Sequence, residues 1–249
     1  MCLFRRMEKE VHPSLGGHLR EAENAIYQKA KKEFLNRLDN SLEGKERVEN
    51  IFALVDELTL EFLKDNPITC HYGCAWCCYQ LVSCTTLEME LIVDYLKFLP
   101  RKPRRVIIQR VKKETLRLRK LHRKIEASSP PGLPKRWELL AEPLEKAHYG
   151  RPCSFLNSAQ SCSIYPVRTI DCRTAKTNDN VCGKTLEETQ AEGVEAIRLL
   201  EEGPKPIRLF FDQVASDLIM EEEEKIYGAI QVVPLAAWSF VPQFEEFFF

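Results

Sequence analysis

Residues 48–67, VENIFALVDELTLEFLKDNP, indicate the class of fold to which this chain belongs. Their apolar side chains recur at intervals of three and four residues, which places them on one face of an α-helix: Val48, Ile51, Val55, Leu58 and Phe62. Asn66-Pro67 follows directly, and the residue before a proline disfavours the helical conformation. The stretch therefore predicts an amphipathic helix that ends before the proline.

The same periodicity runs along most of the chain and predicts a mainly α fold. We expect one helical domain over residues 1–249, with an irregular, cysteine-rich metal-binding core over 67–182. The expected helices lie in three regions and one short segment: N-terminal helices over 15–65, an inserted helical hairpin over 86–127, a short helix over 136–147 and C-terminal helices over 186–240. Thr85-Thr86-Leu87-Glu88 has the spacing of a capping box and predicts the start of the hairpin.

Composition bounds the class of protein. The chain has 249 residues, of which 44% are hydrophobic, and this is enough apolar material for a self-sufficient core. The first residues show no secretory leader, and no run approaches the roughly 20 apolar residues that a membrane helix needs. We therefore expect a cytoplasmic protein without a membrane partner. In that reducing compartment, ten cysteines favour metal binding or catalysis over disulfides.

Four cysteines gather at the start of the predicted core: Cys70, Cys74, Cys77 and Cys78. Their spacing places the four sulfurs on one face if the segment is an α-helix. Four thiolates on one face repel one another unless a cation lies among them, so the pattern indicates a metal centre. The alternative is that the thiols pack as small apolar groups, which does not account for four cysteines within nine residues.

A second group follows far downstream: Cys153, Cys162 and Cys172. The wide spacing predicts ligands on loops that fold around the metal, held by the metal rather than by a core. Arg168 and Arg173 are candidate cofactor-binding residues, because guanidinium groups beside thiolates offset their charge and donate to the sulfurs. We expect the two cysteine segments to converge in space.

The CxxxCxxCC run at 70–78 and the pattern P-C-x-F-L…C-x-I-Y…R…C-R over 152–173 resemble the YkgJ-like family of zinc- or iron-chelating cysteine clusters. The resemblance implies a compact metal-chelating domain, which is also found in flagellin lysine N-methylases. Thr169 departs from the family pattern, in which proline follows the arginine. Cys182 is a plausible eighth thiolate and would allow two four-sulfur sites. Further candidates outside the pattern are two minor ligands, His71 and His148, a core thiol, Cys84, and an isolated thiol, Cys2.

The sequence leaves two questions about the metal-chelating function open: which metal is bound, and what the metal centre does. Seven or eight thiolates exceed the four that one structural zinc needs, so we prefer an iron-sulfur cluster to zinc. Its use would be electron transfer or metal-dependent modification of a protein, and whether the chain is an enzyme, oxidoreductase or methyltransferase-like, stays open. Cys70, Cys74 and Cys77 also have the spacing of radical S-adenosylmethionine enzymes, but the chain lacks their strand-helix alternation. No other catalytic motif stands out.

Charge is divided unevenly along the chain. Residues 101–124 hold twelve Lys or Arg and one acid, Glu114, whereas residues 186–225 hold twelve Asp or Glu. The alternative function is therefore a structural zinc module whose basic helix binds nucleic acid or an acidic protein. We rank nucleic acid below a protein partner, because residues 101–124 contain no aromatic side chain for stacking and the acidic segment could cover the helix. The aromatic end over 244–249 is expected to dock on its own domain.

Overall fold

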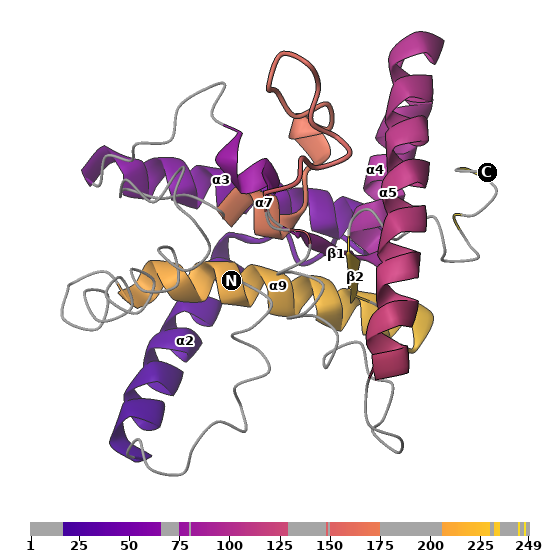
Figure 1. Ribbon diagram of the computed structural model, residues 1–249. Coiled ribbons are helices and arrows are strands. Elements are labelled where there is room, and N and C mark those ends of the chain that lie inside the picture. The colour runs from indigo at the N-terminus through magenta and orange to yellow at the C-terminus, as the bar shows by residue number, and fades with distance from the viewer. Residues whose placement is uncertain are drawn as a thin grey trace. The chain divides into compact units, whose positions relative to one another are not determined.

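The computed structural model describes residues 17–65, 75–79, 81–128, 148, 150–174, 206–229, 232–234, 244 and 247 (Figure 1). In these residues the fold is mainly α, as the periodicity predicts. The α-helices are α2 (Gly17–Arg37), α3 (Gly44–Asp65), α4 (Thr86–Phe98), α5 (Arg101–Ser128), α7 (Ile170–Thr174) and α9 (Pro206–Tyr227). The short elements are η2 (Trp76–Tyr79), η3 (Tyr165–Val167), β1 (Ser83–Thr85) and β2 (Val232–Pro234). The helix predicted over 136–147 lies outside the described residues.

The described elements divide into two compact units. The first unit contains α2, α3, α7 and α9 together with residues 85–87. The second contains η2, most of β1, α4 from residue 88, α5, residues 150–169 and β2. Each unit has its own buried residues.

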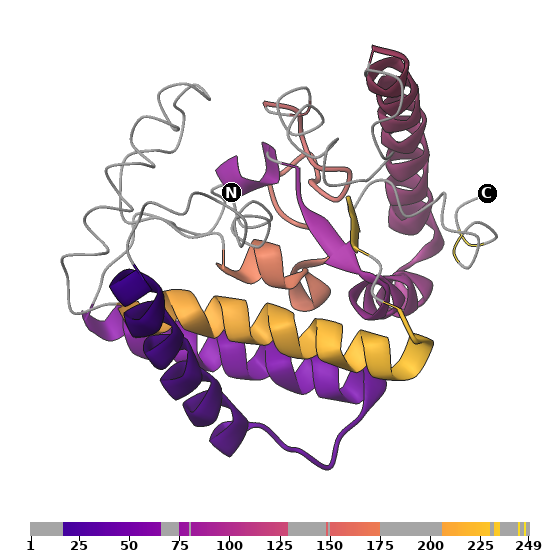
Figure 2. The same cartoon turned by 90° about the horizontal axis from the view of Figure 1, so that it is seen from below.

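In the first unit, α9 is the central helix: it packs against α2, α3 and α7, and it lies along α3 in Figure 2. The apolar face predicted from Val48 to Leu58 is buried, as expected, at Val48, Ile51, Val55 and Leu58. Ala30, Phe34 and Leu38 of α2 are buried as well. The ring of Phe34 lies 6.3 Å from that of Phe211 on α9. Polar contacts add to this packing, because the Tyr27 hydroxyl donates to Asp217 at 2.7 Å. α3 ends at Asp65, directly before Asn66-Pro67.

Two consecutive glutamates of α9 bind the starts of two other helices. The Glu222 side chain accepts a hydrogen bond of 2.6 Å from the backbone N–H of Gly44, the first residue of α3. The Glu223 side chain accepts from the Thr86 hydroxyl at 2.9 Å and from the Leu87 N–H at 3.4 Å, at the start of α4. Both glutamates are buried. Carboxylates satisfy backbone N–H groups that have no partner within the helix, so α9 holds the N-terminal ends of α3 and α4.

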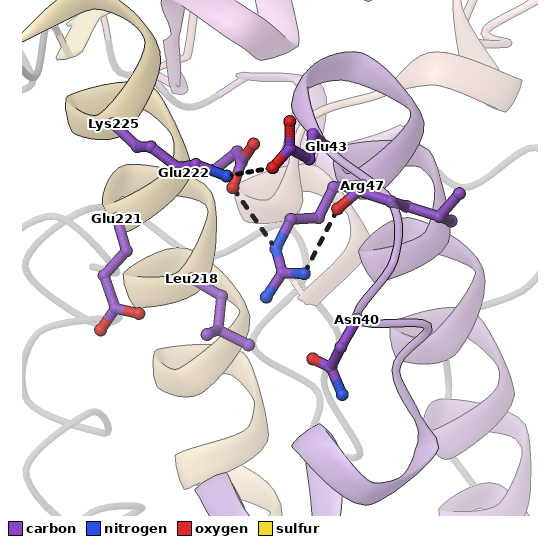
Figure 3. Close-up of a pocket in the computed structure, with 8 residues that line it drawn as sticks. Asn40, Glu43, Arg47, Leu218, Glu221, Glu222 and Lys225 are labelled. Carbon is purple, nitrogen blue, oxygen red and sulfur yellow. Dashed lines mark hydrogen bonds and ion pairs between the residues drawn. The ribbon is translucent and has the colours of Figure 1, made fainter.

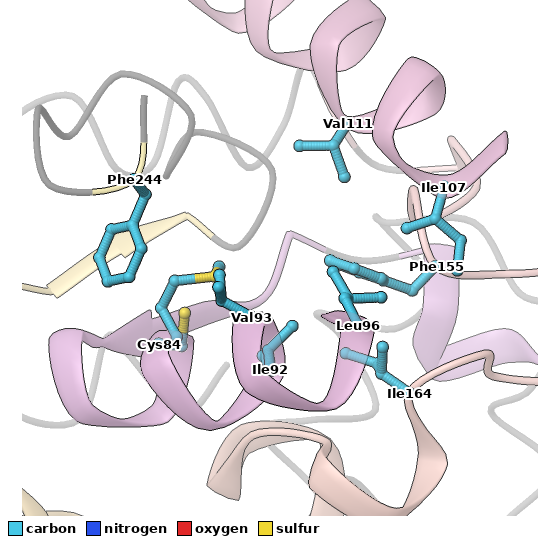
Figure 4. Close-up of a cluster of buried hydrophobic side chains, with 10 residues drawn as sticks. Cys84, Ile92, Val93, Leu96, Ile107, Val111, Phe155, Ile164 and Phe244 are labelled. Carbon is cyan, nitrogen blue, oxygen red and sulfur yellow. The ribbon is translucent and has the colours of Figure 1, made fainter. Parts of the chain in front are cut away.

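The second unit has a hydrophobic core that joins α4 and α5 to distant segments (Figure 4). Its members are Cys84, Met89, Ile92, Val93, Leu96, Ile107, Val111, Phe155, Ile164 and Phe244. Phe244 is 4% exposed, and Phe247 packs against the same cluster. This confirms that these two aromatic residues near the C-terminus dock on their own fold. Cys84, at 2% exposure, is the core thiol that we expected.

Two sequence predictions fail in this unit. Residues 186–240 were predicted to be helical, but Val232–Pro234 form a strand that pairs with β1 in a two-stranded sheet. Three residues are too few to show a period of two, and the β-branched Val232 and Val233 fit a strand better than a helix. The segment over 150–180 was predicted to be held by metal rather than by a core. Instead, Phe155 and Ile164 are each 1% exposed, so apolar burial holds this segment.

Candidate metal centre

The described part of the first cysteine cluster is a 3₁₀ turn. Residues 76–79 form η2, and the Cys78 N–H donates to the carbonyl of Ala75 at 2.9 Å. Residues 76–78 are therefore not α-helical, and the one-face argument, which holds only for an α-helix, does not apply to Cys77 and Cys78. In a 3₁₀ helix, successive residues are rotated by roughly 120°, which differs from the roughly 100° that the one-face spacing assumes. Cys70 and Cys74 lie outside the described residues, as does the side chain of Cys77.

The second cysteine segment runs beside this turn. The Cys153 N–H donates to the carbonyl of Cys78 at 2.6 Å, and the Gly150 N–H donates to that of Tyr79 at 3.0 Å. The Tyr79 hydroxyl also donates to Gln160 Oε1 at 3.2 Å. Gly150 has a φ of +76°, a conformation that favours glycine. Backbone bonds thus bring together Cys78 and Cys153, which are far apart in the sequence.

A tight hairpin places the next cysteine. Leu156 and Cys162 form an antiparallel bridge, and the Ser163 N–H donates to the carbonyl of Phe155 at 2.8 Å. The turn between them is held by Asn157, whose Oδ1 accepts from the N–H groups of Ala159 and Ser161 at 2.9 and 3.0 Å. Asparagine often stabilises turns in this way. The half-buried Cys153 and Cys162 both pack against the hydrophobic core of this unit.

Cys172 and both candidate arginines are described. Cys172 is half-buried on α7, in the first unit. Arg173, beside it, forms an ion pair with Asp56 of α3 and lies 4.2 Å from the centre of the Phe52 ring, so its guanidinium has structural partners. Arg168, in the second unit, donates to the carbonyl of Tyr165 at 3.3 Å and stacks on the Tyr165 ring at 3.8 Å. Their role beside a cofactor stays a prediction, and Cys182 and His71 lie outside the described residues.

The described side chains do not complete a metal site by themselves. Among them, no three of His, Cys, Asp or Glu lie close enough together to share one ion. One polar atom near the cysteines lacks a partner: the Oγ of Ser154, which follows Cys153, is buried without a hydrogen bond. A buried hydroxyl that donates to nothing is unusual, and a thiolate sulfur is an acceptor that would satisfy it. The donor types near Cys78 and Cys153 therefore fit a thiolate-bound metal.

A second cluster, which the sequence did not predict, lies on α5 close to this segment. Glu114 accepts two hydrogen bonds from the Arg117 Nε, at 2.9 and 3.0 Å, and its Oε1 lies 3.0 Å from His148 Nδ1. His148 is 3% exposed, and its carbonyl accepts from the Arg151 N–H at 2.9 Å in the turn before Cys153. Arg117 Nη2 also lies 3.1 Å from His148 Nδ1 and can only donate. Nδ1 therefore donates to the Glu114 carboxylate when it carries the proton, and it accepts from Arg117 when it does not. The sequence feature that could have indicated this cluster is Glu114 itself, the one acid among the twelve Lys and Arg of residues 101–124.

Glu114 makes the stability of this cluster depend on pH. Burial raises the pKa of Glu114, but the hydrogen bonds from His148 and Arg117 outweigh it and lower the pKa from 4.5 to about 2. The stabilising effect is therefore complete above about pH 4.5 and is lost as the pH falls towards 2. We expect Glu114→Gln to cost roughly 2 kcal/mol at neutral pH, after allowance for solvent screening, and less near pH 3. Urea unfolding across this range measures the difference.

The exposed Glu46 on α3 provides the control for this experiment. Glu46→Gln should change the unfolding free energy by less than about 0.5 kcal/mol at either pH. A Glu114→Gln cost that stays constant from pH 7 to pH 3 would show that the ionisation of Glu114 does not contribute.

A polar pocket of about 290 Å³ in the first unit is a separate candidate (Figure 3). Its lining residues are Asn40, Leu42, Glu43, Arg47, Leu218, Glu221, Glu222 and Lys225. Its two cations already have acidic partners: Lys225 Nζ lies 2.6 Å from Glu43 and Arg47 Nε lies 3.5 Å from Glu222. The ion pair with Lys225 also keeps the pKa of Glu43 below its usual value. We interpret this pocket as a contact between α3 and α9 rather than as a ligand site.

No helix in the described part of the chain combines the length and the apolar composition that crossing a membrane requires. Comparison with family models, with curated proteins and with solved structures finds no match for this chain.

Proposed function

We propose that this chain is a metal-chelating protein whose centre is held by thiolates of its second unit. The observation that carries the proposal is the 2.6 Å bond from the Cys153 N–H to the Cys78 carbonyl, which joins two cysteine-rich segments. The proposed ligands are Cys74, Cys77 and Cys78 of the first segment, with Cys153 and Cys162 of the second. Cys70, Cys172 and Cys182 stay ligands predicted from the sequence alone.

The chemistry of the donors supports this assignment. Thiolates bind zinc and iron strongly, and reactive or metal-binding cysteines are commonly part-exposed, as Cys78, Cys153 and Cys162 are. The buried Ser154 hydroxyl supplies a donor for a thiolate sulfur, and such donors tune metal centres. His148 is a further candidate, because a carboxylate on Nδ1 is typical of histidines that bind a metal through Nε2.

We favour an iron-sulfur cluster over zinc, because the number of cysteines in the two segments exceeds what one structural zinc requires. A bound cluster would supply one-electron chemistry for electron transfer or for modification of a protein. The chain would contribute the thiolates, the donor at Ser154 and the apolar core that supports Cys153 and Cys162.

The metal is identified by its colour and by its response to a reductant. We expect protein purified without oxygen, after iron-replete expression, to be brown, to contain iron and sulfide, and to bleach with dithionite. Zinc has no redox chemistry and its thiolate sites are colourless, so near-stoichiometric zinc would contradict the iron assignment while supporting chelation. Visible absorption and elemental analysis of one preparation decide between these results. Protein without either metal would contradict the proposed function itself.

A further inference from the structure

The long helix α5 carries cations on two different faces. Three arginines point into the second unit, where Arg104 donates to the Lys97 carbonyl, Arg110 to the Leu156 carbonyl and Arg117 to Glu114. The single acid of residues 101–124, Glu114, is held by Arg117 and His148. The helix therefore uses its acid and part of its basic charge within the fold.

Six other cations of α5 are exposed and form no hydrogen bond or ion pair with any described residue: Arg101, Lys102, Arg105, Lys113, Lys120 and Arg123. At 100° per residue they fall within about a third of the helix circumference. From Lys102 to Arg123 they span about 32 Å at 1.5 Å per residue. We call these six residues the basic face.

Four described acids of the acidic segment have partners within the first unit. Among them, Glu221 pairs with Lys31, whereas Glu222 and Glu223 bind the starts of α3 and α4. Asp217 accepts a hydrogen bond from Tyr27. The carboxylates of these four acids are therefore engaged within their own unit.

We propose that the basic face binds the phosphate backbone of a nucleic-acid duplex. A duplex presents about one negative charge per 1.7 Å, and its helical turn of about 34 Å matches the length of the face. Residues 101–124 contain no aromatic side chain, so the face lacks platforms for the bases of a single strand.

The composition of the face disfavours two other partners. A membrane-binding helix needs an exposed apolar face, but Ile107, Val111 and Leu118 of α5 are buried. A protein interface is usually centred on aromatic or apolar residues and depleted in lysine. Among the described side chains of α5, the exposed large apolar residues are two, Val106 and Leu116, whereas the basic face contains three lysines. This inference is independent of metal binding.

The test measures binding of the full chain to labelled duplex DNA, duplex RNA and single strands of the same sequence by fluorescence anisotropy. Lys113→Gln/Lys120→Gln is compared with Lys29→Gln/Lys32→Gln, which removes the same charge from exposed positions of α2. We expect the α5 variant to lose about tenfold or more in affinity. The slope of log affinity against log salt concentration should become shallower by about 1.8, because each lost phosphate contact contributes about 0.9. The α2 variant should lose less than about twofold.

Binding to either duplex supports the proposal, and the tighter of the two identifies DNA or RNA as the source of the phosphates. Equal losses in the two variants would show attraction to net charge alone and would overturn the proposal. Tighter binding to single strands, no duplex binding at about 50 mM salt, or tighter binding to an acidic polypeptide would also overturn it. Matching thermal unfolding of both variants and the wild type shows that the fold is retained.

Discussion

Replacing Cys153 by serine is expected to reduce the metal content of the purified protein to less than about a tenth of the wild-type value. The backbone N–H of Cys153 bonds to the Cys78 carbonyl, so this residue joins the second cysteine segment to the first. A serine hydroxyl is a poor ligand for zinc or iron, and the loss of one thiolate from such a site removes most of its affinity. Elemental analysis of matched anaerobic preparations measures the effect.

Cys84 provides the matched control, because it is a cysteine of the same unit that lies in the core rather than beside Cys78. Cys84→Ala leaves a small cavity among apolar side chains, and we expect it to cost about 1 kcal/mol of stability while the metal content stays at the wild-type value. Equal metal loss in the two variants would mean that Cys84 belongs to the ligand set or that metal loss follows destabilisation.

The stability of the metal-free forms separates ligand loss from misfolding. Phe155 and Ile164 are buried on both sides of Cys162, so the second cysteine segment has an apolar anchor that does not require metal. In chelator, Cys153→Ser and the wild type should therefore unfold at nearly the same temperature. Without chelator, the wild type should be more stable, because ligand binding stabilises the folded state.

Replacing Glu223 by alanine is expected to destabilise the protein by about 3 kcal/mol. The Glu223 side chain is fully buried and accepts hydrogen bonds from the Thr86 hydroxyl and the Leu87 N–H. Alanine leaves these donors buried without an acceptor and removes a negative charge from the positive end of α4. Chemical unfolding followed by circular dichroism measures the loss.

The neighbouring Glu224 is exposed, so Glu224→Ala provides a control that also removes one carboxylate from α9. It should change stability by less than about 0.5 kcal/mol. Glu223→Gln keeps one acceptor oxygen and should lie between the two alanine variants. Similar stabilities for the two alanine variants would contradict the assigned role of Glu223 in holding the start of α4.

The helices were predictable where apolar periodicity within the segment is enough to specify a helix. The apolar period predicts α3, which is observed through Asp65, and the helices predicted over 86–127 are observed as α4 and α5. Residues 76–79 were not predictable in this way, because spacings that place cysteines on one face of an α-helix say nothing about whether that helix forms. The strand β2 was missed because its three residues are ordered by pairing with β1.

The candidate metal centre was predictable in its residue types but only partly in its geometry. The cysteine spacing predicts which thiols bind a metal, and this stays a prediction. The backbone bond between Cys78 and Cys153, and the turn with positive φ at Gly150 beside it, are not encoded in that spacing. Arg173 has a partner that the sequence did not indicate, because it pairs with Asp56 of α3, and its role beside a cofactor stays a prediction.

The sequence by itself determined the helical class and the apolar faces that become buried, because both depend on neighbours within a few turns. Only the tertiary structure decided that Glu223 binds the start of α4, that Glu114 contacts His148 and that Cys153 lies beside Cys78. These partners are distant in the chain. Their pairing depends on how the helices and loops pack, which local periodicity does not encode.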